Sequence, residues 1–310
     1  MSNKIEKIVI AGAGLMGASI AQSFPEYGIH TTIYTNCAGD YDRAREIIAS
    51  GQKTLVENNV LTSAESERIQ AAIIYTTDVS CFEEADWIVE AIPENYDLKK
   101  SLFQLISAHA KENAIITSNT SAISINALSK CVKSPERFCG THWLNPPHII
   151  PLVEITKSLM TSQETADIIY QMLAYMKKQP VVLKKDVKGF LSNRLQFALL
   201  REATHLVESG VATPEDIDRT LKYGNGLRYM CSGPFKIVDF GGIEVFNSVA
   251  KYLYPDLNAE TDENHLLDEM VQKGHNGIST YRGFYAYTKE SAAAEEKERD
   301  TKMIEVLKLK

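Results

Sequence analysis

The glycine-rich segment Gly12–Gly17 constrains the fold of this 310-residue chain more than any other feature. It fits G-x-G-x-x-G, directly after the apolar run Lys7–Ala11, which reads as a buried strand, and it opens a helical pattern. The first glycine allows a tight turn, the second lets the backbone approach a pyrophosphate, and the third lets helix and strand pack closely. This context favours a dinucleotide-binding loop over an ordinary structural turn, because a helix N-terminus offers free N–H groups to phosphate. The loop residues expected at the dinucleotide are Gly12, Gly14, Leu15, Met16 and Gly17.

Short apolar runs alternate with helical patterns as far as Lys185. Near-continuous apolar strands separated by helices are typical of a parallel sheet covered on both faces. Beyond the first strand, the sequence predicts strands at residues 30–34, 72–75, 87–91, 114–118, 138–142, 152–155 and 181–184, and a helix over 41–58.

Helical patterns dominate the rest of the chain. A long helix is expected from Phe190 to a stop at Gly210, and a second helix is expected after Thr213 as N-cap with Pro214 in its first turn. A third helix follows residues 233–234 and is interrupted at 241–242, residues 284–287 resemble a strand, and residues 289–310 resemble a solvated terminal helix. We therefore predict an α/β domain over residues 1–186 and a helical domain over residues 187–310.

Composition excludes several classes of protein. The chain has 33 Lys+Arg against 40 Asp+Glu and no basic block, which argues against nucleic-acid binding. It has no run of about 18 apolar residues, so no membrane span is expected. Its five cysteines are scattered without a CxxC pair, so we expect reduced structural thiols and no metal site. Together with an N-terminus too charged for a signal peptide, this predicts a cytoplasmic protein.

The end of the second predicted strand lacks an expected acid. A carboxylate there normally accepts hydrogen bonds from the adenosine ribose and repels a 2′-phosphate. This chain has Thr35 and Asn36 at that place, Asp40 and Asp42 lie several residues too late, and Arg43 is the nearest arginine. We expect Thr35 and Asn36 at the cofactor and NAD as the cofactor, with NADP as the alternative that the sequence leaves open.

Three later stretches carry a resemblance to a known family. They are S-N-T-S at 118–121, H-W-L-N-P-P at 142–147 with Glu154 on the next strand, and G-F-L-S-N-R at 189–194. With the glycine-rich loop and V-E-A-I-P-E-N at 89–95, they resemble the L-3-hydroxyacyl-CoA dehydrogenase family in order and spacing over nearly the whole chain. The resemblance implies a Rossmann domain, an all-α dimerisation domain that forms a homodimer, and NAD(P)-linked oxidation of a 3-hydroxy acid or L-3-hydroxyacyl-CoA to the 3-keto compound.

The chemistry agrees with these residue types. His142 suits proton transfer from the hydroxyl group because imidazole titrates near neutral pH, and Glu154 would accept its other ring N–H. The resemblance implies that Ser121 and Asn193 bind the reacting oxygen or nearby substrate. The alternatives are a helix cap at Ser121 and an ordinary polar residue at Asn193. The resemblance also places further residues at the cofactor, namely Ala91, Ile92, Glu94, Lys99, Asn119 and Asn145; Glu94 and Lys99 could instead only flank a helix start.

Departures from the family pattern concern the substrate. His142 is followed by Trp143-Leu144 where acyl-CoA members carry Phe, and His148 follows the two prolines. The helical segment that approaches the CoA nucleotide in acyl-CoA members is often Lys-rich, whereas residues 46–67 here carry one Lys and four Glu. An acidic surface is a poor match for the phosphates of CoA. The pattern is closer to relatives that act on small acids without CoA, such as L-gulonate, carnitine or hydroxymethylpyridine carboxylates.

Two further alternatives remain. One is a catalytically idle family member with a structural or binding role, which would have no need to keep the four residues Ser121, His142, Glu154 and Asn193. The other is a decarboxylating hydroxyacid dehydrogenase, which relies on a catalytic lysine in its helical domain. The His142–Glu154 pair argues against that enzyme.

Overall fold

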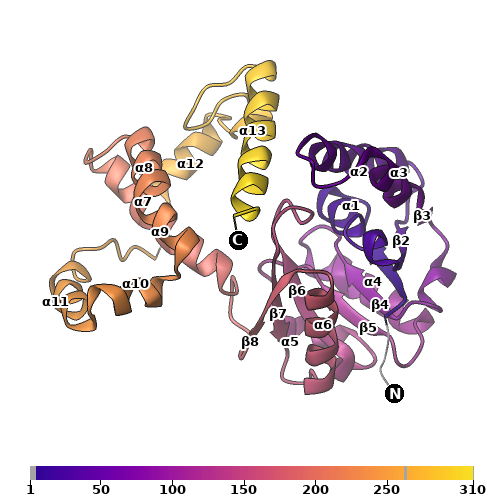
Figure 1. Cartoon of the computed structure of the whole chain (residues 1–310). Helices are drawn as coiled ribbons and strands as arrows, with labels where there is room; N and C mark the ends of the chain where they lie inside the picture. Colours follow the sequence, from indigo (N-terminus) through magenta and orange to yellow (C-terminus); the bar gives the residue numbers. More distant parts are fainter. Residues whose placement is uncertain (1–4, 262–263, 310) are drawn as a thin grey trace. The chain divides into compact units, whose positions relative to one another are not determined.

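Within residues 5–261 and 264–309, which the computed structural model describes, the chain forms one sheet of eight strands (Figure 1). The order is β3-β2-β1-β4-β5-β6-β7-β8, and neighbours are parallel except for the antiparallel pair β6–β7. The strands are β1 Lys7–Ala11, β2 His30–Tyr34, β3 Ile73–Thr76, β4 Trp87–Glu90, β5 Ile115–Ser118, β6 Phe138–Trp143, β7 Leu152–Lys157 and β8 Gln179–Leu183. The predicted strands of the first half are confirmed, with small differences at their ends.

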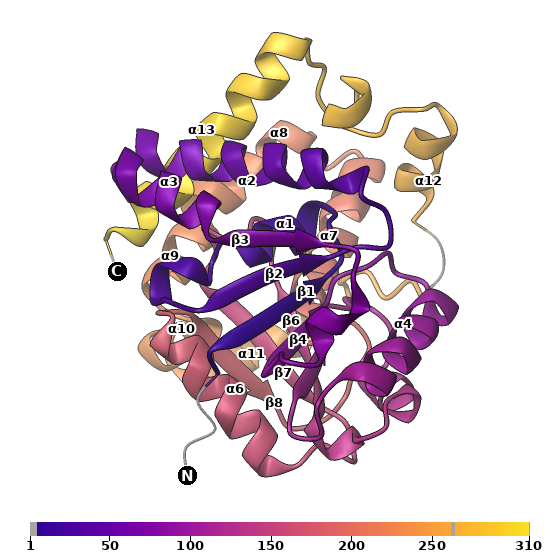
Figure 2. The same ribbon diagram turned by 90° about the vertical axis from the view of Figure 1, so that its right-hand side faces the viewer.

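Helices cover both faces of this sheet (Figure 2). Alternate residues of each strand point to opposite faces. Ile8 and Ile10 of β1 therefore join a core with α1, α2 and α6, whereas Val9 and Ala11 join a second core with α4 and α5. The helices are α1 Leu15–Ala21, α2 Asp40–Glu57, α3 Ser63–Ala71, α4 Tyr96–His109, α5 Ile125–Leu128 and α6 Gln163–Tyr175, with single turns at Pro25–Tyr27, Val79–Phe82, Ser129–Cys131 and Pro135–Arg137.

Contacts divide the chain into two units, Met1–Asn193 with Glu296–Lys310 (unit 1) and Arg194–Glu295 (unit 2). This division differs from the predicted domains 1–186 and 187–310. Glu154 of β7 accepts hydrogen bonds from the backbone N–H groups of Leu191 and Ser192, so the chain stays with unit 1 beyond residue 187. The end of the chain also returns to unit 1.

Unit 2 consists of helices. Its predicted cap is confirmed, because the side chain of Thr213 accepts a hydrogen bond from the backbone N–H of Asp216. The predicted interruption is confirmed as well, since Gly242, at φ +89°, separates two helices. The helices are α7 Ser192–Glu208, α8 Pro214–Thr220, α9 Gly226–Cys231, α10 Pro234–Gly241, α11 Ile243–Leu253 and α12 His265–Gln272, with single turns at Leu221–Asn225 and Ile278–Thr280.

The predicted strand at residues 284–287 is wrong. Only isolated bridges form near it, between Gly277 and Arg282 and between Arg282 and Ala286. The chain doubles back too tightly for a ladder to extend, since a Cβ on Gly283 would lie 2.8 Å from the Cα of Gly277.

Helix α13 (Lys289–Leu307) begins in unit 2 and ends in unit 1. The predicted helix is confirmed, but it is not fully solvated. Ile304 is buried in a small apolar cluster with Leu55 of α2 and Ile149. The Lys297 ammonium lies 3.0 Å from a carboxylate oxygen of Glu57, which adds an ion pair to the same contact. The last turns of the chain are therefore packed against α2.

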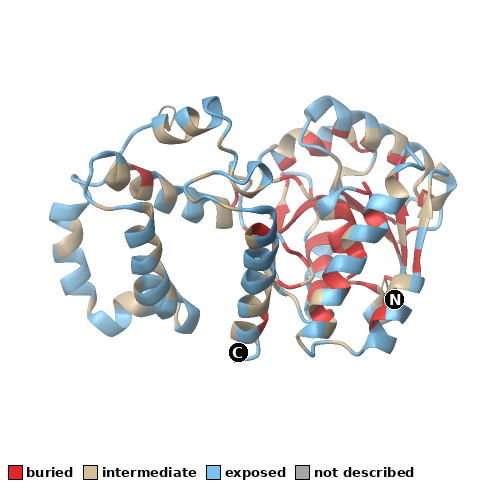
Figure 3. Ribbon diagram, turned by 90° about the horizontal axis from the view of Figure 1, so that it is seen from above, coloured by how far each residue is buried: buried red, intermediate tan, exposed pale blue. Residues whose placement is uncertain are grey.

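Burial differs between the units (Figure 3). Unit 1 holds both large apolar cores, with side chains such as Trp87 and Phe103 fully buried. Among the described residues of unit 2, only Thr204 and Ala292 are buried. None of the helices in the described ranges has the length and apolar content needed to cross a bilayer.

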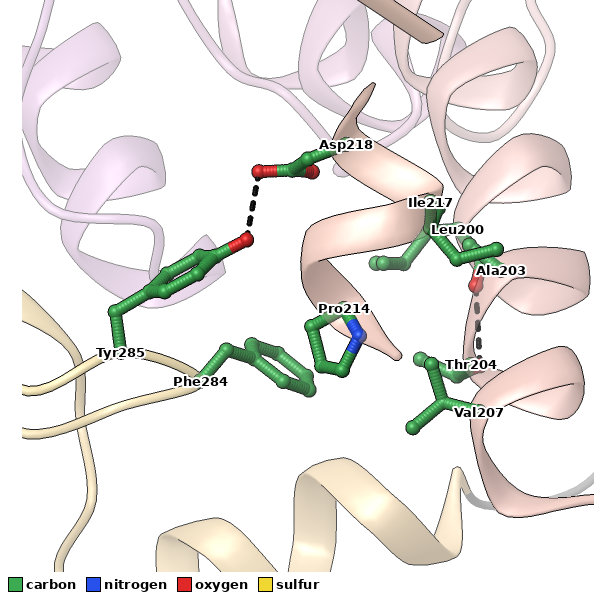
Figure 4. Close-up of a pocket in the computed structure, with 9 residues that line it drawn as sticks. All are labelled: Leu200, Ala203, Thr204, Val207, Pro214, Ile217, Asp218, Phe284 and Tyr285. Carbon is green, nitrogen blue, oxygen red and sulfur yellow. Dashed lines mark hydrogen bonds between the residues drawn. The ribbon is translucent and has the colours of Figure 1, made fainter. Parts of the chain in front are cut away.

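Unit 2 encloses a small hollow of about 140 Å³ between α7, α8 and the segment that contains Phe284 (Figure 4). Its walls are apolar except for Thr204, Asp218 and Tyr285. The Tyr285 hydroxyl donates to Asp218 Oδ2 at 3.0 Å. Burial and this hydrogen bond raise the pKa of Tyr285 to about 12. The Thr204 hydroxyl instead donates to the backbone carbonyl of Leu200 at 3.0 Å, so the polar groups of the hollow all have partners within unit 2.

Candidate active site

The glycine-rich loop has the geometry that the sequence predicts. Gly12 has φ +134°, and a Cβ there would lie 2.5 Å from the carbonyl oxygen of Ala91. A Cβ on Gly17 would lie 1.9 Å from the carbonyl oxygen of Gly12. Larger residues at these two positions would force the loop, β4 and α1 apart. Gly14 precedes α1 without a side-chain cap, which leaves the first N–H groups of the helix open to an anion.

A cavity of about 510 Å³ opens above this loop at the carboxyl ends of the strands. Ligands of open α/β sheets bind at this edge. The cavity brings together most of the residues predicted to bind the cofactor, and its lining residues are Gly12, Ala13, Gly14, Leu15, Met16, Thr35, Asn36, Asp40, Arg43, Ala91, Ile92, Pro93, Glu94, Asn119 and Ser121. A hollow of this volume with a glycine cradle and polar groups in its walls fits a dinucleotide.

His142 and Glu154 form the predicted pair. They lie directly opposite each other on the antiparallel strands β6 and β7. His142 Nδ1 lies 2.7 Å from Glu154 Oε2, and both side chains are buried. Because Nδ1 is bonded to the carboxylate, Nε2 is the ring nitrogen that can meet a substrate.

Glu154 is held as a carboxylate. Burial alone would raise its pKa, but His142 and the backbone N–H groups of Ser192 and Leu191 donate to it and hold the pKa below its usual range. The two backbone bonds end on Oε1, at 2.9 Å from Leu191 and 2.8 Å from Ser192. Glu154 therefore also connects the catalytic histidine candidate to the segment that carries Asn193, the next residue along α7.

Ser121 lies in a turn that Glu94 organises. Glu94 Oε1 accepts hydrogen bonds from the Thr120 hydroxyl and from the backbone N–H groups of Ser121 and Ala122, at 3.0 Å and 2.9 Å for the two N–H groups. Burial opposes the ionisation of Glu94, but these hydrogen bonds and the nearby Lys99 hold its pKa below the usual range. Glu94 thus lines the cavity and also positions Ser121.

Lys99 lies behind this wall, although the sequence predicts it at the cofactor. Its ammonium is buried, 2.6 Å from Glu90 Oε1 and 3.3 Å from Glu94 Oε2. Burial raises the pKa of Glu90, against the opposing effects of Lys99 and of the Ser118 hydroxyl. The sequence did not predict that Glu90 binds Lys99 behind the cavity wall, although Glu90 belongs to the motif at 89–95. A buried acid in an otherwise apolar strand was the available signal.

Asn119 connects the cofactor cavity to the strand that carries His142. It lines the cavity, and its Oδ1 accepts a hydrogen bond from the backbone N–H of Trp143 at 2.9 Å. Trp143 follows His142 directly, so the His142–Glu154 pair lies next to the cavity wall. Asn145 is exposed on the loop after β6, and Asn193 is half-buried near the start of α7.

The sequence spacing predicted that Asp40 lies too far along the chain to reach the end of β2, and this prediction is wrong. The Thr35 hydroxyl donates to Asp40 Oδ2 at 2.7 Å, so the chain folds Asp40 back to that place. Arg43 also lines the cavity. Sequence spacing alone missed both residues, because the intervening segment bends between strand and helix.

Comparisons with known proteins agree with this geometry. Residues 7–187 match the family model of the 3-hydroxyacyl-CoA dehydrogenase NAD binding domain, and residues 189–287 match that of the C-terminal domain. The chain belongs to the 3-hydroxyacyl-CoA dehydrogenase family. It is an NAD-dependent oxidoreductase, as the resemblance implied, with a Rossmann domain followed by the helical domain of the family.

Two kinds of relative bear on the substrate. The chain is 33% identical over 306 residues to a 5-formyl-3-hydroxy-2-methylpyridine 4-carboxylate 5-dehydrogenase of Mesorhizobium japonicum, covering 98% of both proteins. A crystal structure of such a dehydrogenase, described as an NAD+ dependent dismutase, superposes with a TM-score of 0.92 at 32% identity over 99% of this chain and 98% of that chain.

Relatives of the second kind are named for a CoA ester. The chain is 35% identical over 282 residues to a probable 3-hydroxybutyryl-CoA dehydrogenase of Deinococcus radiodurans, covering 91% of this chain and all of the relative. The (S)-3-hydroxybutyryl-CoA dehydrogenase of Ralstonia eutropha superposes with a TM-score of 0.75 at 32% identity, over 92% of this chain and all of that chain.

Proposed function

We propose that this dehydrogenase oxidises the hydroxyl group of a small carboxylic acid that carries no CoA, and reduces the corresponding carbonyl compound. The observation that carries the proposal is the packing of α13. This helix lies beyond residue 287, where the match to the family's C-terminal domain ends, and its last turns pack on α2 through Ile304 and Lys297. In acyl-CoA members, as the resemblance implies, the segment that corresponds to residues 46–67, and so includes most of α2, approaches the CoA nucleotide.

Charge supports the same conclusion. The Lys297 ammonium forms an ion pair with the Glu57 carboxylate, and the Lys308 ammonium donates to the backbone carbonyl of Asn58 at 2.7 Å. Lys297 of α13 and Lys308, which follows the helix, are therefore engaged within the protein and do not form an open patch for phosphates. The higher structural similarity to the pyridine carboxylate dehydrogenase also favours a small acid.

His142 is proposed as the acid–base group. Its Nε2 takes the hydroxyl proton during oxidation and returns it to the carbonyl oxygen during reduction. Glu154 stabilises the imidazolium that forms, because its carboxylate is 2.7 Å from Nδ1 and is ionised. NAD supplies the hydride acceptor when it is bound.

Ser121 and Asn193 are proposed to hold the reacting oxygen and the adjacent part of the substrate. The turn at Ser121 is fixed by Glu94, and the start of α7 is fixed by Glu154, so both side chains have rigid supports. Ala91, Ile92, Asn119 and Asn145 would contact the cofactor, and Lys99 would act by positioning Glu94.

The test is NADH oxidation by the full chain with acetoacetyl-CoA, free acetoacetate and 5-formyl-3-hydroxy-2-methylpyridine 4-carboxylate as substrates. We expect kcat/KM for at least one free acid to exceed that for acetoacetyl-CoA by about a hundredfold. Acetoacetyl-CoA as the better substrate would contradict the proposal. Ile304→Asp places a charge in the buried contact between α13 and α2, and it should lower the ratio of kcat/KM for the free acid to kcat/KM for acetoacetyl-CoA. Leu309→Asp, at an exposed position, should leave this ratio unchanged.

We also propose a homodimer formed through unit 2 and a cytoplasmic location. Unit 2 exposes many large apolar side chains, including Phe235 at 86% and Phe240 at 79%. A closed two-fold pair is the commonest way to bury such a surface. The location is supported by the five free cysteines, as expected of a reducing compartment.

A further inference from the structure

The end of β2 holds a carboxylate that comes from α2. Thr35, which is 6% exposed, donates its hydroxyl hydrogen to Asp40 Oδ2 at 2.7 Å. The same hydroxyl oxygen accepts a hydrogen bond from the backbone N–H of Cys37 at 3.3 Å. Because the Thr35 hydroxyl is bonded on both sides, it holds the Asp40 carboxylate at one place. Thr35 thus positions an acid instead of being one.

This carboxylate faces the cofactor cavity. Asp40, Asn36 and Arg43 line the same cavity as the glycine-rich loop. The backbone N–H of Gly12 donates to the carbonyl oxygen of Tyr34 at 2.9 Å, so the end of β2 lies beside that loop. In a dinucleotide-binding sheet, this is the place of the adenosine ribose.

We propose that Asp40 selects NAD against NADP, with Thr35 as its positioning residue. The carboxylate can accept hydrogen bonds from the ribose hydroxyls of NAD, and it repels the 2′-phosphate of NADP. Arg43 lines the same cavity and can pair with the 2′-phosphate of NADP once the Asp40 carboxylate is neutralised. The choice between NAD and NADP therefore depends on the charge of Asp40. The inference rests on NAD binding and is independent of the substrate.

Asp42 provides a matched control on the same helix turn. Its side chain is 90% exposed and forms an ion pair with Arg45 at 2.9 Å. It does not belong to the cavity lining. Asp40→Asn and Asp42→Asn therefore remove the same charge from neighbouring positions, and only the first removes it from the cavity.

The experiment measures Kd for NADH and NADPH by fluorescence titration of the full chain without substrate. We expect the wild type and Asp42→Asn to prefer NADH by a similar factor. In Asp40→Asn, NADPH should bind about tenfold more tightly or better than in the wild type, and NADH should bind several-fold more weakly. Thermal unfolding checks that each variant is folded. Equal affinity of the wild type for both cofactors, or equal shifts in the two variants, would overturn the proposal.

A relocated acid tests the role of Thr35. Thr35→Asp/Asp40→Asn moves the carboxylate from the helix to the strand and should restore the preference for NADH, because a carboxylate again faces the ribose. Thr35→Val should lower the preference only in part, since Asp40 keeps its charge but loses its anchor. If the double variant resembled Asp40→Asn, and Thr35→Val matched the wild type, the assignment of this position to the ribose would be wrong.

Discussion

The two units of this protein use their apolar residues in different ways. In unit 1, the strands and helices bury Trp87, Phe103 and Phe138 completely. In unit 2, Phe235, Phe240 and Tyr252 are 86%, 79% and 69% exposed. Both units come from one chain of ordinary composition, so the difference lies in what each unit can cover. A sheet between two helix layers encloses its own core, whereas the single chain leaves the apolar side chains of unit 2 open to solvent.

This contrast assigns different tasks to the two units. The candidate proton-transfer pair and the cofactor cavity lie in unit 1, and burial fixes the side chains of the pair. The exposed apolar residues of unit 2 carry no such chemistry and suit contact with a second copy. Variants that disturb the two kinds of residue should therefore differ in what they change.

The largest effect is expected at the enclosed pair. His142→Gln should lower kcat by about 10²–10⁴-fold, because it removes the acid–base group, while Kd for NADH changes little. Stopped-flow or steady-state NADH oxidation and a fluorescence titration give the two quantities. His30→Gln, at an exposed position on β2, is the control. A variant that kept near wild-type kcat would remove His142 from the mechanism.

The second-largest effect is expected for a variant of the exposed apolar surface of unit 2. If unit 2 forms the proposed homodimer, Phe235→Asp should weaken dimer formation by about thirtyfold or more, since it places a charge in the proposed apolar interface. Leu159→Asp makes the same kind of change at a residue of unit 1 that is 92% exposed, and it should leave the association unchanged. Sedimentation velocity over a range of concentrations measures both. A wild-type chain that stays monomeric at micromolar concentration would end the proposal of a homodimer.

The smallest effect concerns pH. The folded protein holds the pKa of Glu154 below its unfolded value, so ionised Glu154 contributes stability above the unfolded pKa, and this contribution is lost as the pH falls through the folded pKa. Glu154→Gln should therefore lose less of its stability than the wild type between about pH 6 and about pH 3. Urea unfolding at several pH values tests this. Glu67→Gln, an exposed residue of α3, should follow the wild-type curve.

The sequence predicted the eight-stranded sheet and the His142–Glu154 pair well, because both depend on local signals. Apolar runs of strand length gave the eight strands, and the loop at 12–17 needed only its glycines. The place of Asp40 could not be predicted, since it depends on how residues 36–39 bend and on a hydrogen bond to Thr35. The burial of Ile304 depends on contact with Leu55 and Ile149, which lie far away in the sequence.

The course of α13 has a consequence for dissecting this protein. Because the chain leaves unit 1 after Asn193 and returns to it at Glu296, unit 2 is an insertion within unit 1. Unit 1 is therefore not a continuous stretch of sequence, although the match to the NAD binding domain runs without a break over residues 7–187. A fragment that stopped at Asn193 would lose Ile304 and leave Leu55 and Ile149 without their apolar partner. We therefore expect a fragment of unit 1 to form this apolar cluster only if residues 296–309 are kept and joined to the first piece by a linker.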